Sequence, residues 1–165
     1  MEIVIKPVAE NDIETMREIA WKGWYPYYLQ IISEEQIRFM YATSYSKEAI
    51  GQQMAEGHQF LVLYADGQPA VMASFSPFIA DKHIWKLHKL YSDPQFQGKG
   101  LGRTMLDAVV QSAGSQGAQS IQLNVNRKNP TYKFYLKCGF QLLWNEDIPF
   151  GTYWMNDYRM SLEIS

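Results

Sequence analysis

Hydrophobic and polar positions change their period along the chain, and this change divides the sequence into helical and extended segments. Apolar residues return every third or fourth position where a helix is expected and every second position where a strand is expected. Strands are therefore expected at residues 2–8, in two runs within 58–77, and at 83–92, 120–126, 140–146 and 153–163. Helices are expected from residue 11 or 12 to about 22, from about 33, over 46–56, over 100–115, and from 129 to 139.

Turn and capping residues agree with several of these boundaries. Asp66-Gly67 is a strong hairpin signal between the two runs of 58–77. A capping-box pattern at Ser33 and the pair Asn129-Pro130 indicate the starts of two helices. The aromatic stretch "GWYPYYLQI", residues 23–31, is expected to interrupt the first helix.

The order of these segments predicts one α/β (α+β) domain over residues 1–165, built around a single sheet. Its length suits one domain with a sizeable core. The sequence contains no repeat, no low-complexity segment and nothing that resembles a linker.

Composition and charge narrow the function classes. The net charge of −2 excludes a generally basic nucleic-acid binder. No apolar stretch approaches the length needed to cross a bilayer, and the first ten residues lack the features of a signal peptide, so a cytoplasmic location is expected. Cys138 is the single cysteine, which excludes a disulfide framework and a structural zinc site, and no metal is expected. Aromatic residues make up 15% of the chain, which suggests rings that line a cleft as well as a core.

The stretch "QFQGKGLGR", residues 95–103, places Gly98, Gly100 and Gly102 between a strand and a helix. Their spacing fits neither a phosphate-binding P-loop nor the dinucleotide fingerprint. The remaining interpretation is an anion site, because glycines allow close approach and a helix N-terminus presents unpaired N–H groups. A tight turn without a ligand is the alternative that the glycines alone leave open.

Two motifs resemble signatures of the GNAT superfamily of N-acetyltransferases. Residues 97–102, "QGKGLG", match its acetyl-coenzyme-A motif [QR]-x-x-G-x-[GA], and "NPTYKFYLKCGF", residues 129–140, is similar to its second signature. Thr131 and Cys138 depart from the residues that are usual in the family, and neither change touches the chemistry.

The resemblance implies a fold and a cofactor. The implied fold is a mixed, mostly antiparallel sheet of about seven strands flanked by helices, in the order β-α-α-β-β-β-α-β-α-β-β. The implied cofactor is acetyl-CoA, with its pyrophosphate on the glycine loop and its pantetheine arm along the end of the fourth strand. By this resemblance the cofactor-binding residues are Leu90, Tyr91, Ser92, Gln97, Gly98, Lys99, Gly100, Leu101, Gly102, Arg103, Asn129 and Lys137.

The resemblance also assigns catalytic roles. Tyr135 occupies the position of the tyrosine that protonates the leaving thiolate, and a backbone N–H near Leu90 would stabilise the oxyanion. Tyr135 could instead be a core tyrosine with its hydroxyl at a rim. His88 stands where many members carry a glutamate base, and it could equally be a histidine held within the sheet.

The amine acceptor is the part that the motifs leave most open. The candidate acceptor-binding residues are Trp24, Tyr28 and Trp154, and the loop before the last strand supplies Glu146, Asp147 and Asp157. Residues 1–56 hold nine acidic and five basic side chains, which favours a cationic small-molecule amine. The overall pattern of the chain, including its closing segment "YWMNDYRMSLEI", is similar to bacterial polyamine-type acetyltransferases, so a polyamine is the leading hypothesis. A peptide or protein amine, or a non-catalytic coenzyme-A-binding module, is the alternative. No nucleic acid or membrane partner is expected, and a homodimer stays open.

Overall fold

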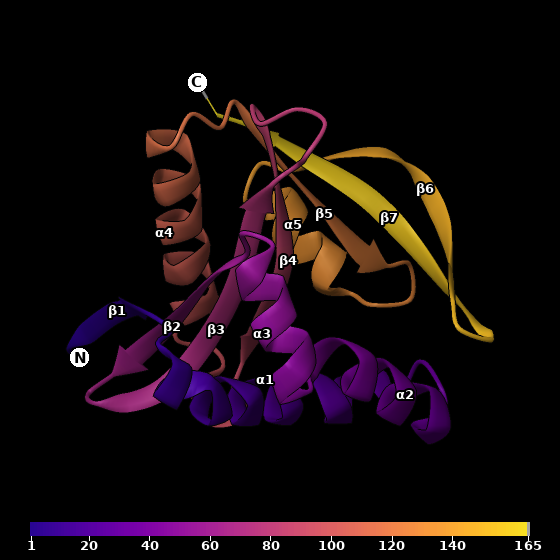
Figure 1. Cartoon of the computed structure of the whole chain (residues 1–165), viewed down its shortest axis with the longest axis horizontal. Helices are drawn as coiled ribbons and strands as arrows, with labels where there is room; N and C mark the ends of the chain where they lie inside the picture. The colour runs from indigo at the N-terminus through magenta and orange to yellow at the C-terminus, as the bar shows by residue number, and fades with distance from the viewer. Residues whose placement is uncertain (165) are drawn as a thin grey trace.

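Seven strands form one sheet in the order β1-β2-β3-β4-β5-β7-β6 in the computed structural model, which describes residues 1–164 (Figure 1). All neighbouring strands are antiparallel except β4 and β5, which are parallel. The strands are β1 Ile3–Pro7, β2 Gln59–Ala65, β3 Gln68–Pro77, β4 Ile84–Ser92, β5 Ser120–Asn126, β6 Gln141–Phe150 and β7 Tyr153–Glu163. This mixed, mostly antiparallel sheet confirms the predicted fold class.

Five α-helices cover the two faces of the sheet (Figure 1). They are α1 Ile13–Tyr28, α2 Glu34–Tyr45, α3 Lys47–Ala55, α4 Leu101–Ser115 and α5 Thr131–Lys137. Helices α1 to α3 pack on one face, and α4 and α5 pack on the other. Ser33 and Ser46 cap α2 and α3, since each hydroxyl accepts a hydrogen bond of 3.1 Å from a backbone N–H of the first turn.

The first helix is longer than the sequence predicted. It continues through residues 23–28 with Pro26 inside it, whereas an interruption was expected there. An interior proline destabilises a helix by about 3 kcal/mol. Packing offsets this cost, because Trp24 is only 3% exposed and its ring lies 5.2 Å from Tyr28 and 5.8 Å from Tyr45. The expected break was therefore wrong.

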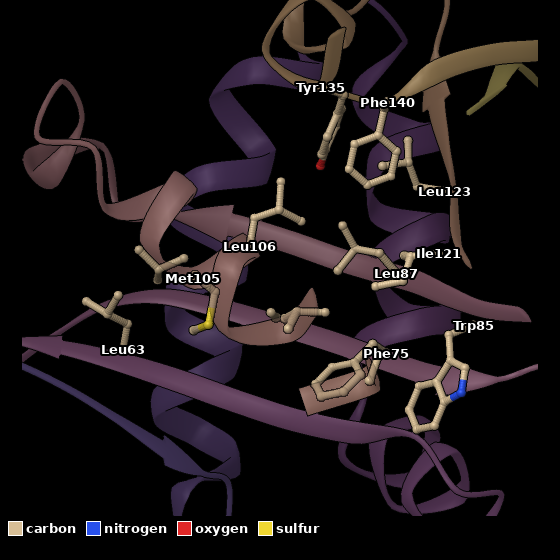
Figure 2. Packing of buried hydrophobic residues seen from close by; sticks show 14 of the residues in the cluster. Leu63, Phe75, Trp85, Leu87, Met105, Leu106, Ile121, Leu123, Tyr135 and Phe140 are labelled. Atoms are coloured by element: carbon tan, nitrogen blue, oxygen red, sulfur yellow. The ribbon is translucent and has the colours of Figure 1, made fainter. Parts of the chain in front are cut away.

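The larger hydrophobic cluster lies between the sheet and the helices α4 and α5 (Figure 2). Met105 and Leu106 of α4 meet Leu87 and Leu123 of the two parallel strands there, all less than 5% exposed. This packing fixes α4, and with it the loop before α4, against the ends of β4 and β5.

The parallel strands separate before they end. Pairing between β4 and β5 runs from Ile84 with Ser120 to Leu87 with Leu123 and stops there, although both strands continue. On the other side of β4, Ser74 pairs with Lys89 and Phe75 with Leu87, so His88 is an extra, bulged residue. The residues of β4 after the bulge remain paired with β3 on one side and face a gap on the side of β5.

No helix within residues 1–164 is long and apolar enough to cross a membrane.

Candidate active site

A cleft of about 540 Å³ occupies the gap between β4 and β5. Its walls come from the ends of these strands, from the glycine loop and the first turn of α4, from α5, and from the C-terminal half of α1. Segments far apart in the sequence therefore share one cavity.

The cleft gathers most of the cofactor-binding residues that the resemblance implied. Of the implied cofactor-binding residues, those that line the cleft are Leu90, Tyr91, Ser92, Gln97, Gly98, Gly100, Leu101, Gly102, Arg103 and Asn129. Lys99 and Lys137 are not among its lining residues, and the Lys99 ammonium lies 5.8 Å from the centre of the Phe96 ring.

The glycine loop has the conformation that an anion cradle requires. Gly98 and Gly100 have φ angles of 80° and 73°, a region that residues with a Cβ adopt rarely. No heavy atom lies within 4 Å of the position that a Cβ would take at either glycine, so the space above the loop is open. Gly100 begins α4 without any side-chain cap, which leaves the first N–H groups of the helix free for a ligand. The loop thus fits the pyrophosphate of acetyl-CoA.

Tyr135 is both a core residue and a cleft residue. It lies on α5, is 7% exposed, and packs at 5.5 Å against Phe140 (Figure 2). Burial raises the pKa of its phenol above the ordinary value, and the nearby Tyr28 adds to this rise. The hydroxyl therefore stays protonated at neutral pH and can act as a proton donor.

His88 lines the cleft, but its surroundings weaken it as a base. Its Nε2 lies 2.7 Å from the Ser76 hydroxyl, and its ring stacks on His58 with 4.1 Å between ring centres. Burial, and then the neighbouring His58, Lys86 and Lys89, lower the pKa of His88 to about 2. The imidazole is therefore neutral at physiological pH and has little affinity for a proton.

The three candidate acceptor residues do not come together. Tyr28 lines the cleft with Tyr135. Trp24 is buried in the cluster of α1 and α2 and does not line the cleft. Trp154 is 60% exposed and lines a separate hollow of about 470 Å³, beside Ile32 and Arg127.

Sequence reasoning missed several lining residues, among them Gly23 and Asn124. A Cβ on Gly23 would collide with the backbone carbonyl of Ser92, so this glycine lets α1 approach the end of β4. The sequence feature that could have identified Gly23 is a glycine inside a helical pattern. Asn124 lies on β5 at the edge of the gap. The sequence feature that could have identified it is an amide side chain within a strand that has a buried face.

Residues 28–162 match the family model described as "Acetyltransferase (GNAT) domain". The chain belongs to the GNAT acetyltransferase family. This assignment confirms the resemblance and makes the chain an acetyl-CoA-dependent acetyltransferase. Three helices, instead of the two implied by the resemblance, join the first two strands.

Individual relatives agree with this GNAT assignment. A spermidine N(1)-acetyltransferase of Thermoplasma acidophilum is 30% identical over 148 residues, which are 86% of this chain and 90% of that protein. The solved structure of the PaiA N-acetyltransferase of Thermoplasma acidophilum, in complex with coenzyme A, matches with a TM-score of 0.82 and 27% identity over 99% of this chain and 100% of that one. The ribosomal-protein-S18-alanine N-acetyltransferase of Escherichia coli shares the fold, with a TM-score of 0.76 and 18% identity over 99% of this chain and 95% of that one.

Proposed function

We propose that this GNAT protein transfers the acetyl group of acetyl-CoA to a primary amine of a small molecule, with polyamines as the leading acceptor class. The observation that carries this proposal is that one cleft is lined both by the open glycine loop and by Tyr135. An anion cradle and a proton donor in the walls of a single cavity suit a long cofactor with a phosphate-bearing end and a reactive end.

Each part of the cleft has a role toward the cofactor, which supplies the acetyl group as a thioester. The free N–H groups from Gly98 to Arg103 would hold the pyrophosphate, because a helix N-terminus attracts negative charge. The backbone of residues 90–92 faces the gap left by β5 and would pair with the amides of the pantetheine arm. Asn129 lines the opposite wall.

The chemistry needs a proton for the leaving thiolate and a donor to the developing oxyanion. Tyr135 would supply the proton, since it lines the cleft and its phenol is protonated at neutral pH. A backbone N–H at Leu90 would supply the oxyanion hydrogen bond. His88, bonded to Ser76 and stacked on His58, would shape the wall of the cleft instead of accepting a proton.

A small amine is the acceptor that has most support. The relative that is 30% identical over most of the chain is named a spermidine acetyltransferase. The likeness to the ribosomal-protein acetyltransferase is one of fold, at 18% identity. A cytoplasmic location and a homodimer stay predictions.

An acceptor screen tests the proposal. Purified protein with acetyl-CoA is offered polyamines, amino acids, aminoglycosides and short peptides, while free coenzyme A and acetylated products are measured. Turnover with polyamines above all other classes is the expected result. Turnover with peptides alone would move the acceptor to that class, and acetyl-CoA binding without turnover on any amine would indicate a non-catalytic module.

A further inference from the structure

Two buried side-chain oxygens beside the cleft have no hydrogen-bond partner within residues 1–164. They are Oδ1 of Asp157, a residue of β7 that is 2% exposed, and Oδ1 of Asn124 on β5, which lines the cleft. Asp157 pairs in register with Asn126, two residues from Asn124, and the Asn124 amide bonds to Glu146 at 2.8 Å. A buried acceptor without a partner is costly, so two on neighbouring strands indicate a ligand that carries N–H donors.

The cations around Asp157 do not neutralise it. Arg127 forms its ion pair with Asp147 at 2.7 Å, and Arg159 forms its pair with Glu146 at 2.8 Å. No ion pair to Asp157 forms within the described part of the chain. The carboxyl is thus buried without an ion pair among the described residues, and Lys86 of β4 is the cation whose charge acts on it most strongly.

Asp157 is also close to the residues that line the cleft. Asp157 pairs with Asn126 on β5, and Asn124, two residues away on the same face of that strand, lines the cleft with Tyr28 and Tyr135. Burial, and to a smaller extent the charge of Asp157, raises the pKa of the Tyr28 hydroxyl. Tyr28 in turn contributes to the raised pKa of Tyr135. The carboxyl, Tyr28 and the proposed proton donor therefore belong to one region of the molecule.

We propose that Asp157 accepts the proton which the acceptor's ammonium group must lose before it can attack, while the side-chain oxygen of Asn124 accepts a second N–H bond and orients the amine. The inference rests on the proposed acetyl transfer. One N–H bond of R–NH₃⁺ breaks and one O–H bond forms on the carboxylate, which leaves R–NH₂ and a neutral carboxyl group. No electron is gained or lost, and the proton later passes to solvent.

The electrostatic surroundings suit this role. Burial raises the pKa of Asp157 to about 6, and the charges of Lys86 of β4 and of Arg127 oppose this rise while Glu146 of β6 adds to it. The carboxyl is therefore ionised at neutral pH and more basic than an exposed one. His88, with its pKa lowered to about 2, is the poorer proton acceptor of the two.

The test compares two acceptors on the variant Asp157→Asn, which keeps the size of the side chain. Spermidine is an ammonium ion at neutral pH, whereas methoxyamine is a weak base that is already uncharged. Loss of a general base should lower kcat/KM for spermidine by about a hundredfold or more. The loss for methoxyamine should be less than about tenfold, since that amine has no proton to give up before attack. Equal losses for both amines, or no loss for spermidine, would overturn the inference.

Two further measurements separate this inference from the proposed function. In the wild-type protein, kcat/KM for spermidine should fall as the pH drops through about 6, because the Asp157 carboxyl becomes protonated. A profile without that fall overturns the role of Asp157 even if the variant does not fold. Spermidine binding to the protein–coenzyme A complex, measured by calorimetry, should weaken at least tenfold in Asp157→Asn, and an unchanged affinity also counts against the inference. Wild-type protein that acetylates neither amine would refute the proposed function instead.

Glu163→Gln is the matched control. Glu163 lies on the same strand and face as Asp157, is exposed, and loses the same charge on substitution. Its kinetics and its spermidine affinity should match those of the wild-type protein.

Discussion

At the residue scale, Tyr135 and His88 both line the cleft, and their surroundings determine what each side chain can do. Tyr135 combines both interpretations that its sequence position allowed, because the ring packs in the core while the residue lines the cleft. His88 also reaches the cleft, yet its stacking on His58 and its bond to Ser76 leave it a weak base. Position in a motif thus identified both residues, and their surroundings decide how each can act.

Replacing Tyr135 by Phe removes the proposed proton donor and keeps the ring. We expect kcat to fall about a hundredfold. The dissociation constant of acetyl-CoA should change less than about threefold, since binding relies on the backbone of the loop and of β4. Steady-state kinetics and calorimetry measure the two quantities. An unchanged kcat would remove Tyr135 from the mechanism.

At the element scale, the loop before α4 and the helix α1 build opposite walls of the cleft. Gly100 needs its left-handed conformation to begin α4 with free N–H groups. Gly23 needs its missing Cβ to bring α1 onto the end of β4. The two glycines therefore act for different reasons, one through backbone conformation and the other through space.

Gly100→Val tests the loop. A branched side chain at a φ of 73° strains the loop and projects into the open cradle, so acetyl-CoA affinity should fall at least tenfold while the fold persists. Gly117→Val is the control, because Gly117 has a φ of 100° at the other end of α4 and does not line the cleft. That variant should lose about 1–2 kcal/mol of stability but keep its affinity. Calorimetric titration with acetyl-CoA would contradict the assignment if Gly100→Val bound normally.

Gly23→Ala tests the contact between α1 and β4. The added methyl group collides with the Ser92 carbonyl, so the helix must shift, and both the melting temperature and the acetyl-CoA affinity should fall. Gly51→Ala in α3 is the matched control, because nothing lies within 4 Å of its Cβ position, and it should stabilise the protein by about 0.5–1 kcal/mol. Thermal unfolding with and without acetyl-CoA distinguishes the two variants. Equal melting temperatures for the two variants would show that α1 can accommodate a methyl group at residue 23 without colliding with the Ser92 carbonyl.

At the scale of the whole molecule, strands from the two halves of the chain and helices on both faces meet around one gap in the sheet. The β6–β7 ribbon also reaches α2, where Phe39 lies 5.7 Å from Phe150 and 5.8 Å from Tyr153 (Figure 1). Folding also buries Asp157 with no ion pair to it among residues 1–164, and the cost of this arrangement appears in the global free energy of unfolding.

The pH dependence of stability measures that cost. The pKa of Asp157 rises from 3.8 to about 6 on folding, so the folded state binds the proton more tightly than the unfolded chain does. The stabilisation this gives is complete below pH 3.8 and is lost as the pH rises through about 6. Relative to Asp157→Asn, the wild-type protein should therefore lose about 3 kcal/mol of unfolding free energy over this range. Urea unfolding at several pH values measures this loss. If the free energy of unfolding depended on pH in the same way in both proteins, folding would not raise the pKa of the Asp157 carboxyl.

The sequence alone determined the features that depend on neighbours along the chain. Alternation and helical periodicity located most strands and helices, and two short motifs identified the family, the cofactor loop and Tyr135. These succeed because a φ angle, a helix start and a motif are encoded within a few residues. Only the tertiary structure decided how far α1 extends past Pro26, since rings from α2 hold that turn.

The same limit applies to the acceptor side of the site. In the sequence, Trp24 and Trp154 are equally plausible as residues that line the acceptor pocket. In the structure, Trp24 is buried in a helix cluster and Trp154 lines a separate hollow. Asp157 is one of three acidic residues in its segment, and only the pairing of β5, β6 and β7 separates it from the two that have cationic partners. Burial and charge pairing depend on segments far apart in the chain. For this reason the sequence could predict a cofactor site, while only the fold shows which of the three carboxylates has no ion pair among the described residues.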